Sequence, residues 1–155
     1  MAEQEWGVAA IGTVTSSRSE AIDDDWGDVT ATITLHPPLD ERSVAGLADF
    51  SHVEVVFLFH QVDPGAVCLH SRHPRGNPEW PDVGILAQRA KDRPNRLGLC
   101  TCEVVAVDGA SIVVRGLDAI DGTPVLDVKP YLEEFAPRGP VRQPAWSHEL
   151  MRGYW

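Results

Sequence analysis

Basic residues are scarce in this 155-residue chain, which has 13 lysines and arginines against 23 aspartates and glutamates and a formal net charge of −10. Proteins that bind long nucleic acids normally show a basic balance or a broad basic face. Composition therefore argues against a general nucleic-acid binder. The positive charge is concentrated in residues 72–96, which hold six basic and three acidic residues. This segment favours a compact anionic or polar ligand, with a solvated surface loop as the alternative.

Long apolar runs and cysteines are also few. No run approaches the ~18 apolar residues that cross a membrane, and glutamates stand near the start, where a secretion signal has lysine or arginine. We therefore expect a cytoplasmic protein. Cys68, Cys100 and Cys102 form an odd set that does not indicate a disulfide framework. Because no second Cys or His cluster lies at ligand spacing, we expect buried thiols and no metal.

Short runs rich in branched and aromatic residues dominate the rest of the sequence, as is typical of strands. The predicted strands are residues 8–14, 29–35, 52–60 and 83–88, with a hairpin over residues 100–117 that turns at Asp108-Gly109. Residues 39–47 and 147–155 are typical of short helices, with Asp40 and Ser147 as N-caps. The pattern predicts a mainly β protein, a small single-domain β-barrel over residues 1–155 with long loops and one or two short helices.

Two predicted loops are unusually rich in charged side chains and are candidate ligand-binding segments. Residues 87–99, AQRAKDRPNRLGL, contain four basic side chains, together with Pro94, which restricts the backbone conformation, and Gly98, which leaves it flexible. Residues 116–131, GLDAIDGTPVLDVKPY, place Asp118 and Asp121 about one turn apart. These two aspartates either cap backbone N–H groups locally or point together into one pocket. In a pocket they would suit ribose hydroxyls, an ammonium group or a sulfonium.

Four segments follow one another in a specific order along the chain: IGTV at residues 11–14, GLADFSHVEVVFLFH at 46–60, GILAQRAKDRPNRLGL at 84–99, and residues 116–131. Together they resemble the TrmO/TsaA-like family of S-adenosylmethionine-dependent methyltransferases, over about residues 8–135. The resemblance implies a small barrel that forms a homodimer and holds S-adenosylmethionine in loops at one end. Residues 136–155 are then expected to pack on the barrel or on the dimer partner.

The resemblance also implies a cofactor site, formed by His60, Gln61, Arg89, Leu99, Asp118, Ala119, Ile120 and Asp121. Arg89 is expected to pair with the carboxylate of the cofactor's amino-acid tail. Asp118 or Asp121 is expected to hold its ammonium group or ribose hydroxyls. A nitrogen nucleophile must lose a proton, for which His60 or His52 is the candidate base, with a structural histidine as the alternative for each. Asp121 is the other candidate catalytic residue.

The methyl acceptor stays open. Family members that methylate threonylcarbamoyl-adenosine beside the tRNA anticodon usually carry Arg-Pro-Asn-Pro, whereas this chain has Arg96 in place of the second proline. They usually carry Pro-Arg-Gln where this chain has three aspartates, at 23–25, before Trp26, and many have a C-terminal extension. An acidic loop repels phosphate and suits a cationic amine beside Trp26, unless that tryptophan only packs in the core.

A small nitrogen-containing acceptor is therefore slightly favoured. A tRNA is the alternative acceptor, and a non-catalytic S-adenosylmethionine-binding module is the second alternative. The candidate acceptor-binding residues are Trp26, Arg72, Arg75, Arg93, Asn95, Arg96, Lys129 and Tyr131. The arginines among them are expected to face either the acceptor or the partner subunit.

Overall fold

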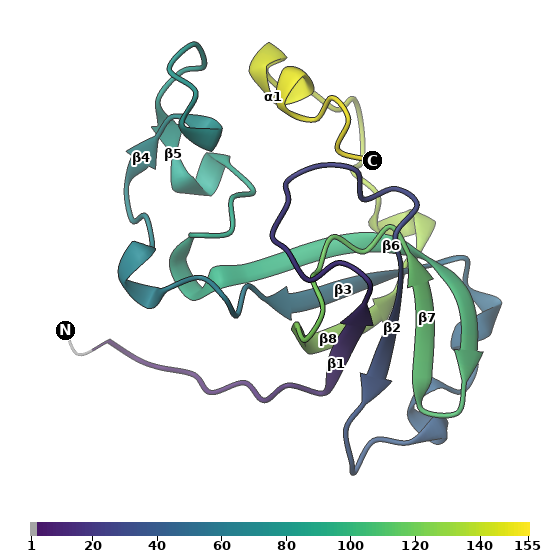
Figure 1. Cartoon of the computed structure of the whole chain (residues 1–155). Coiled ribbons are helices and arrows are strands. Elements are labelled where there is room, and N and C mark those ends of the chain that lie inside the picture. The colour runs from purple at the N-terminus through teal and green to yellow at the C-terminus, as the bar shows by residue number, and fades with distance from the viewer. Residues whose placement is uncertain (1–2) are drawn as a thin grey trace.

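The computed structural model describes residues 3–155, and its centre is a closed barrel of six antiparallel strands (Figure 1). The order around the barrel is β1-β2-β7-β6-β3-β8. The strands are β1 (Gly12–Ser16), β2 (Thr30–Leu35), β3 (His52–Leu58), β6 (Leu97–Asp108), β7 (Ser111–Arg115) and β8 (Pro124–Pro130). A separate two-stranded sheet pairs β4 (Ser71–Arg72) with β5 (Val83–Gly84). The predicted β-barrel is confirmed.

The helices are all short. Most are 3-10 helices, at Glu41–Val44, Leu47–Asp49, Pro64–Ala66, Pro74–Gly76, Ile85–Ala87, Pro94–Arg96 and Glu133–Phe135, and α1 (Ala145–Leu150) is α-helical. Asp40 caps the first of them, as predicted. The predicted helix over residues 39–47 is broken, because Gly46 takes a left-handed conformation with φ of 85°. The prediction of Ser147 as an N-cap is wrong, since Pro144 precedes α1 and Ser147 lies within it.

Some strand boundaries also differ from the predictions. The first strand begins at Gly12 rather than at residue 8, and residues 83–88 give two strand residues before a 3-10 helix. The sequence pattern does not predict β8, because prolines stand at both of its ends. In the structure β8 follows β3 along most of its length but meets β1 in register at two pairs, Gly12–Val125 and Thr13–Pro124. The two prolines lie at the ends of the strand, where Pro124 stands opposite Thr13 and Pro130 opposite Val53.

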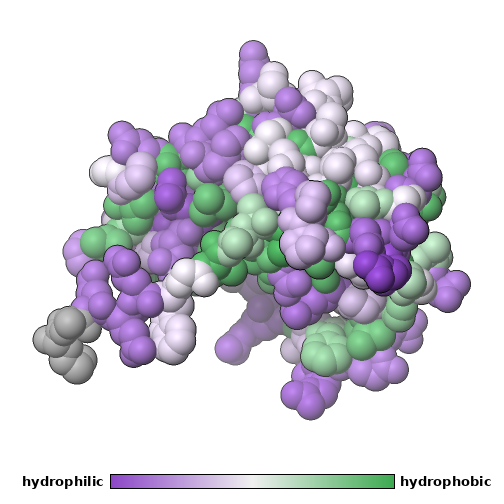
Figure 2. All heavy atoms as spheres, turned by 90° about the horizontal axis from the view of Figure 1, so that it is seen from below, coloured by the Kyte–Doolittle hydropathy of each residue, from purple (hydrophilic) through white to green (hydrophobic). Residues whose placement is uncertain are grey.

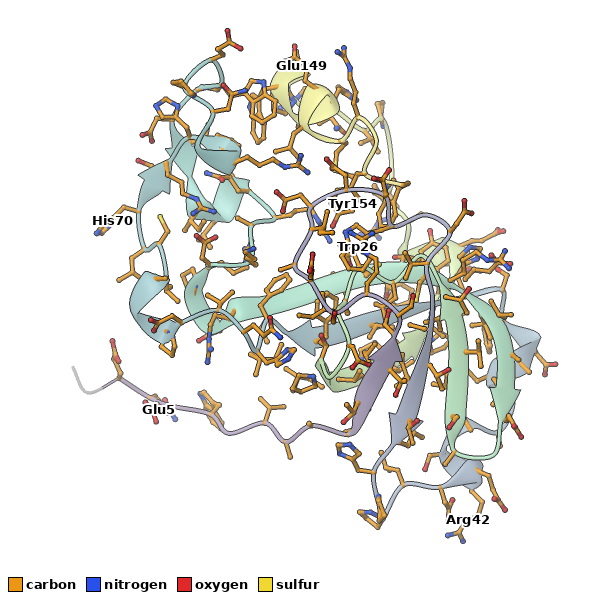
Figure 3. The ribbon with its side chains drawn as sticks, in the orientation of Figure 1. Glu5, Trp26, Arg42, His70, Glu149 and Tyr154 are labelled. Atoms are coloured by element: carbon orange, nitrogen blue, oxygen red, sulfur yellow. The ribbon has the colours of Figure 1, made fainter. Side chains whose placement is uncertain are left out.

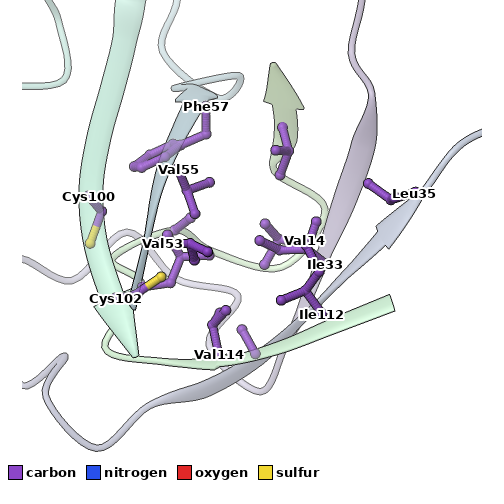
Figure 4. Close-up of a cluster of buried hydrophobic side chains, with 14 of the residues drawn as sticks. Val14, Ile33, Leu35, Val53, Val55, Phe57, Cys100, Cys102, Ile112 and Val114 are labelled. Atoms are coloured by element: carbon purple, nitrogen blue, oxygen red, sulfur yellow. The ribbon is translucent and has the colours of Figure 1, made fainter. Parts of the chain in front are cut away.

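The core fills the barrel interior, with side chains from alternate residues of each strand (Figure 4). Its most buried members, none more than 1% exposed, are Val14, Ile33, Val53, Val55, Phe57, Ile112, Val114, Leu117 and Val125. Cys100 and Cys102 are buried on β6, as predicted. Burial raises the pKa of both thiols, that of Cys102 to about 12. Both thiols are therefore kept protonated at neutral pH.

Residues far apart in sequence meet beside the barrel. The loop between β1 and β2 arcs toward α1 (Figure 1) and is bonded to residues 144–155, which we call the C-terminal strap. The N–H of Asp25 donates to the carbonyl of Gly153 at 2.9 Å, and that of Trp26 donates to the carbonyl of Tyr154 at 2.7 Å. The strap therefore packs on the β1–β2 loop of its own chain.

The surface mixes polar and apolar groups. On the face shown in Figure 2, apolar side chains gather in a band across the middle, between hydrophilic regions. Leu97 and Leu99 of β6 are 42% and 48% exposed, because alternate residues of this strand point away from the core. None of the helices among residues 3–155 is long and apolar enough to span a bilayer.

Candidate functional site

One end of the barrel carries the loop that connects β7 to β8, residues 116–123. The N–H of Asp121 donates to the carbonyl of Arg18 at 2.7 Å, which ties this loop to the segment after β1. His60 lies two residues beyond β3 and reaches the same loop, since its Nε2 is 3.8 Å from where a β-carbon on Gly122 would stand. The structure therefore places His60 next to this loop.

Asp118 has the most unusual environment in this loop. Its Oδ2 accepts a short hydrogen bond from the hydroxyl of Tyr154, while its Oδ1 is buried and has no hydrogen-bond partner among residues 3–155. It also lies close to Cys100, whose pKa is raised first by burial and then by the charge of Asp118. A buried carboxylate oxygen without a partner is costly in free energy. A ligand that carries an ammonium or hydroxyl group would supply that partner.

The second aspartate of the pair has a structural role. The Oδ1 of Asp121 accepts a hydrogen bond from the N–H of Ser16 at 2.9 Å, across 105 residues of sequence. It caps the end of β1 rather than its own turn, which is closed instead by Thr123 donating to the carbonyl of Ile120 at 2.7 Å. The side chain of Ala119 is buried, so this residue offers a ligand its backbone groups.

Arg89 brings positive charge to the same place. Its Nη2 donates to the carbonyl oxygen of Leu99 at 2.5 Å. Burial and the charge of Asp118 raise the pKa of the Tyr154 hydroxyl, and the charge of Arg89 opposes them in part. A guanidinium and a carboxylate thus act on the same hydroxyl. Such a pair suits a ligand that carries both a carboxylate and an ammonium group.

His60 is available for chemistry. It is half-buried, and its imidazole makes no hydrogen bond to any other part of the described chain. Gln61 follows it and is exposed. In contrast, the Nδ1 of His52 contacts the hydroxyl of Ser51 at 2.8 Å, at the opposite end of β3. Of the two candidate bases, His60 is therefore the one beside Asp118's loop.

The arginines of the basic segment hold their own loops together. The Nη2 of Arg72 lies 2.5 Å from Oδ1 of Asp92. The Nη1 of Arg93 donates to the carbonyl of Gln88 at 2.6 Å, and that of Arg96 donates to the carbonyl of Val62 at 2.8 Å. In the structure these three cations therefore make contacts within the chain.

This loop also contains two residues with left-handed backbone. Asn95 and Arg96 have φ of 62° and 52°. Asparagine tolerates this conformation better than most residues. At the position of Arg96 the family usually has a proline, whose ring locks φ near −65° and excludes the geometry seen here. The departure from the family motif is therefore also a departure in backbone conformation.

Two arginines contact the acidic loop before β2. The Nη2 of Arg75 lies 2.9 Å from Oδ1 of Asp24. Arg18 donates to the carbonyls of Asp24 and Asp25 at 2.8 and 2.7 Å, and its guanidinium lies 3.8 Å from the centroid of the Trp26 ring. Trp26 is only 3% exposed. Trp26 is therefore not open to a cationic acceptor, although Asp23 and Asp25 stay exposed.

Two predicted acceptor residues lie away from the cluster. Lys129 pairs with Oδ2 of Asp127 at 2.9 Å, and the N–H of Tyr131 donates to the carbonyl of His52 at 2.9 Å. Both are near the end of β8 farthest from the 116–123 loop. Among residues 3–155 no group of three or more His, Cys, Asp or Glu side chains could hold a metal ion.

Sequence reasoning missed Tyr154 and Arg18. Tyr154 was expected only to pack on the barrel or on a partner, yet it bonds to Asp118 across 36 residues. Arg18 lies outside the four recognised segments and holds the acidic loop. The contact of Tyr154 has no signal in local spacing, because it depends on where two distant segments meet, whereas Arg18 lies in the same loop as the carbonyls it binds.

The chain is similar to known proteins. The family model for the tRNA-methyltransferase O N-terminal domain matches residues 23–136. The human tRNA (adenine(37)-N6)-methyltransferase is 38% identical over 110 residues, which is 71% of this chain and 24% of that protein. A Pseudomonas aeruginosa protein named "Putative S-adenosylmethionine-dependent methyltransferase RcsF" is 41% identical over 106 residues, 66% of this chain and 43% of that protein.

A solved structure gives the same result. The crystal structure of TrmO from Pseudomonas aeruginosa has a TM-score of 0.72 and 28% identity to this chain, and it covers 90% of this chain and 62% of that one. The chain therefore spans less than half the length of the two curated relatives described. The family match includes β2 to β8, His60, Arg89 and Asp118, and it ends before the C-terminal strap. The chain belongs to the family of the tRNA-methyltransferase O N-terminal domain.

Proposed function

We propose that this chain is an S-adenosylmethionine-dependent methyltransferase that acts on the exocyclic nitrogen of a modified adenosine in tRNA. The observation that carries the proposal is the buried carboxylate of Asp118 bonded to Tyr154, together with Arg89 bonded to Leu99 of β6, in a chain of this family. One is a carboxylate with an unpartnered buried oxygen, and the other is a guanidinium held against the neighbouring strand.

These residues fit the cofactor. The amino-acid tail of S-adenosylmethionine ends in a carboxylate and an ammonium group, which complement Arg89 and Asp118 respectively. The half-exposed side chain of Leu99 and the backbone of Ala119 are the groups we assign to the adenosine. Gln61, Ile120 and Asp121 belong to the same proposed site by their place in the two loops.

Bound S-adenosylmethionine supplies an electrophilic methyl group on a cationic sulfonium. The acceptor nitrogen forms the new N–C bond as the S–C bond breaks, and the products are S-adenosylhomocysteine, the methylated nitrogen and one proton. We assign acceptance of that proton to His60, whose imidazole has no other hydrogen-bond partner in the described chain. Alignment of the reacting atoms by the two loops supplies most of the remaining rate.

A tRNA is now the preferred acceptor, and a small amine becomes the alternative. The human relative is named for methylation of a tRNA adenine. The argument for a cationic acceptor depended on free aspartates beside Trp26. In the structure Arg75 and Arg18 bind that loop, and the ring of Trp26 is buried. The roles of Trp26, Lys129, Tyr131 and the basic segment in acceptor binding stay predictions.

The test is transfer of a labelled methyl group. Wild type, Arg89→Ala and Asp118→Asn are incubated with methyl-labelled S-adenosylmethionine and total tRNA from a bacterial strain that lacks tRNA (adenine(37)-N6)-methyltransferase. We expect the wild type to label one modified adenosine, identified by mass spectrometry after nuclease digestion, and both variants to lose this activity. Turnover with an amine pool but not with tRNA would support the small acceptor. Cofactor binding without transfer to either pool would indicate a binding module.

We further propose that the chain is a single domain that acts as a homodimer in the cytoplasm. Exposed leucines on the outer face of β6, Leu97 and Leu99, support a protein contact beside the candidate site. Light scattering at several concentrations measures the mass directly. A monomer at all concentrations would exclude the homodimer.

A further inference from the structure

The C-terminal strap contacts the candidate cofactor site through one side chain. The hydroxyl of Tyr154 donates to Oδ2 of Asp118 and leaves Oδ1 without a partner in residues 3–155. We propose that Tyr154 is a positioning residue for cofactor binding, which fixes the carboxylate of Asp118 so that its second oxygen is left for the cofactor's ammonium or ribose hydroxyl group. This inference rests on the proposed function, because it requires Asp118 to contact S-adenosylmethionine.

The backbone on both sides of Tyr154 is fixed. The carbonyl of Gly153 accepts from Asp25 at 2.9 Å, and the carbonyl of Tyr154 itself accepts from Trp26 at 2.7 Å. A β-carbon on Gly27 would lie 2.7 Å from the carbonyl carbon of Trp155, so the strap packs directly on this glycine. Figure 3 shows Trp26 and Tyr154 together between the barrel and α1. A side chain on such a fixed backbone is held in place before ligand arrives.

The other end of the strap is held by the segment that carries the small sheet. The Nε1 of Trp80 donates to Oε2 of Glu149 at 2.9 Å. The rings of Tyr154 and Trp155 pack edge to face, with centroids 4.8 Å apart. The strap therefore spans from the region of β4 and β5 to the β1–β2 loop, and Tyr154 points from it to Asp118.

The electrostatics of the pair fit a fixed donor and a fixed acceptor. Burial and the charge of Asp118 raise the pKa of the Tyr154 hydroxyl, so it stays protonated and donates. A carboxylate that accepts one fixed hydrogen bond has already lost its rotational freedom. Ligand binding to its other oxygen then costs no further side-chain conformational entropy. The family match ends at residue 136, so this contact comes from a part of the chain outside the matched domain.

The experiment is a double-mutant cycle measured by calorimetric titration with S-adenosylmethionine. The proteins are wild type, Tyr154→Phe, Asp118→Asn and the double variant, with thermal unfolding recorded for each. Phenylalanine keeps the ring against Trp155 and removes only the hydroxyl. Ser147→Ala is the matched control, because it removes another hydroxyl bond of the strap, to the carbonyl of Pro144 at 2.6 Å, without touching Asp118.

We expect Tyr154→Phe to weaken binding about tenfold, in line with loss of a hydrogen bond to a charged group, and Ser147→Ala to leave it unchanged. In the Asp118→Asn background the same change is expected to have little further effect, because the two residues act as a unit. Equal weakening in both backgrounds would show that Tyr154 acts through packing, and tighter binding by Tyr154→Phe would show that the strap blocks the site. Either result overturns the inference.

The outcome also separates this inference from the proposed function. If Asp118→Asn loses binding while Tyr154→Phe matches wild type, the cofactor site stands and the role of Tyr154 is wrong. If Asp118→Asn binds as tightly as wild type, the assigned cofactor contact is wrong and the inference fails with it.

Discussion

Gly98 of β6 lies directly beneath the ring of Phe57 on β3, and the two residues are paired in the strand register. A β-carbon on Gly98 would stand 2.4 Å from two ring atoms of Phe57, which is itself 1% exposed and contacts Phe59 edge to face at 5.3 Å. The glycine is thus required by close packing, and its place in the arginine-rich motif has a structural reason.

The first prediction concerns this contact. We expect Gly98→Ala to lower the free energy of unfolding by about 1–3 kcal/mol, because the buried ring must shift to make room. Chemical denaturation measures the change. Gly84→Ala is the matched control, since its β-carbon would meet nothing within 4 Å. Equal midpoints for Gly98→Ala and wild type would contradict the packing argument.

The second prediction concerns Arg89. Arg89→Ala is expected to weaken S-adenosylmethionine binding at least tenfold in calorimetric titration, because a charged hydrogen bond contributes about 1.5–3 kcal/mol. Arg42→Ala serves as control, since this exposed arginine pairs with Asp40 at the lower end of the barrel in Figure 3. If the folded wild type does not bind S-adenosylmethionine, the chain has the fold of the family without its cofactor-binding activity.

The third prediction concerns the proposed base. Replacing His60 with glutamine is expected to lower kcat by ~10²–10⁴, the usual contribution of general-base catalysis, with little change in the affinity for S-adenosylmethionine. His70→Gln is the control, because His70 lies on the outer side of the small sheet (Figure 3). A normal kcat for His60→Gln would assign proton acceptance to another group or to water.

The fourth prediction concerns thiol reactivity. Cys68 is partly exposed, whereas Cys100 and Cys102 are buried with raised pKa values. Since the thiolate is the reacting form, iodoacetamide at neutral pH is expected to modify Cys68 first in the folded protein. Peptide mass spectrometry over time measures the order. Rapid modification of Cys100 in folded protein would contradict its placement in the barrel.

The fifth prediction concerns stability at high pH. In the unfolded chain the two buried thiols ionise near their ordinary pKa of 9.0, whereas folding raises the pKa of Cys102 to about 12 and that of Cys100 further. Because the folded state retains protons that the unfolded chain releases, the contribution of these thiols to the free energy of unfolding is expected to be constant below about pH 9 and to fall as pH rises above it. Thermal unfolding of Cys102→Ala should show a shallower fall than wild type.

The sequence predicted the barrel because strand alternation and turn chemistry are local signals. The hairpin between β6 and β7 is an example. Asp108 pairs with Ser111, so the two turn residues are Gly109 and Ala110, one position later than the predicted turn at Asp108-Gly109. The resemblance similarly brought His60, Arg89 and Asp118 into one predicted site. It could not separate Asp118 from Asp121, because the difference depends on Ser16 and Tyr154, which lie far from both in sequence.

The acidic loop shows the same limit. Three adjacent aspartates predict repulsion of phosphate when their charges are summed along the chain. Their actual field also depends on Arg75, which reaches Asp24 from a distant segment, and on Arg18 of the same loop, which binds its backbone carbonyls. Charge summed along a sequence is therefore a poor guide to the potential at a site built from loops.

The short register between β1 and β8 has a consequence for motion. Two residue pairs join these strands, whereas seven join β3 to β6. Local opening of a closed barrel is expected first where two neighbouring strands share the fewest residue pairs. The amide hydrogens of Ile11 and Val14, which donate to the carbonyls of Val125 and Thr123, should therefore exchange with solvent before those of the rest of the barrel. Residues 116–123 lead straight into β8. A ligand bound to that loop would slow the same exchange. Deuterium uptake at the β1–β8 junction would therefore measure ligand binding at a position outside the binding site.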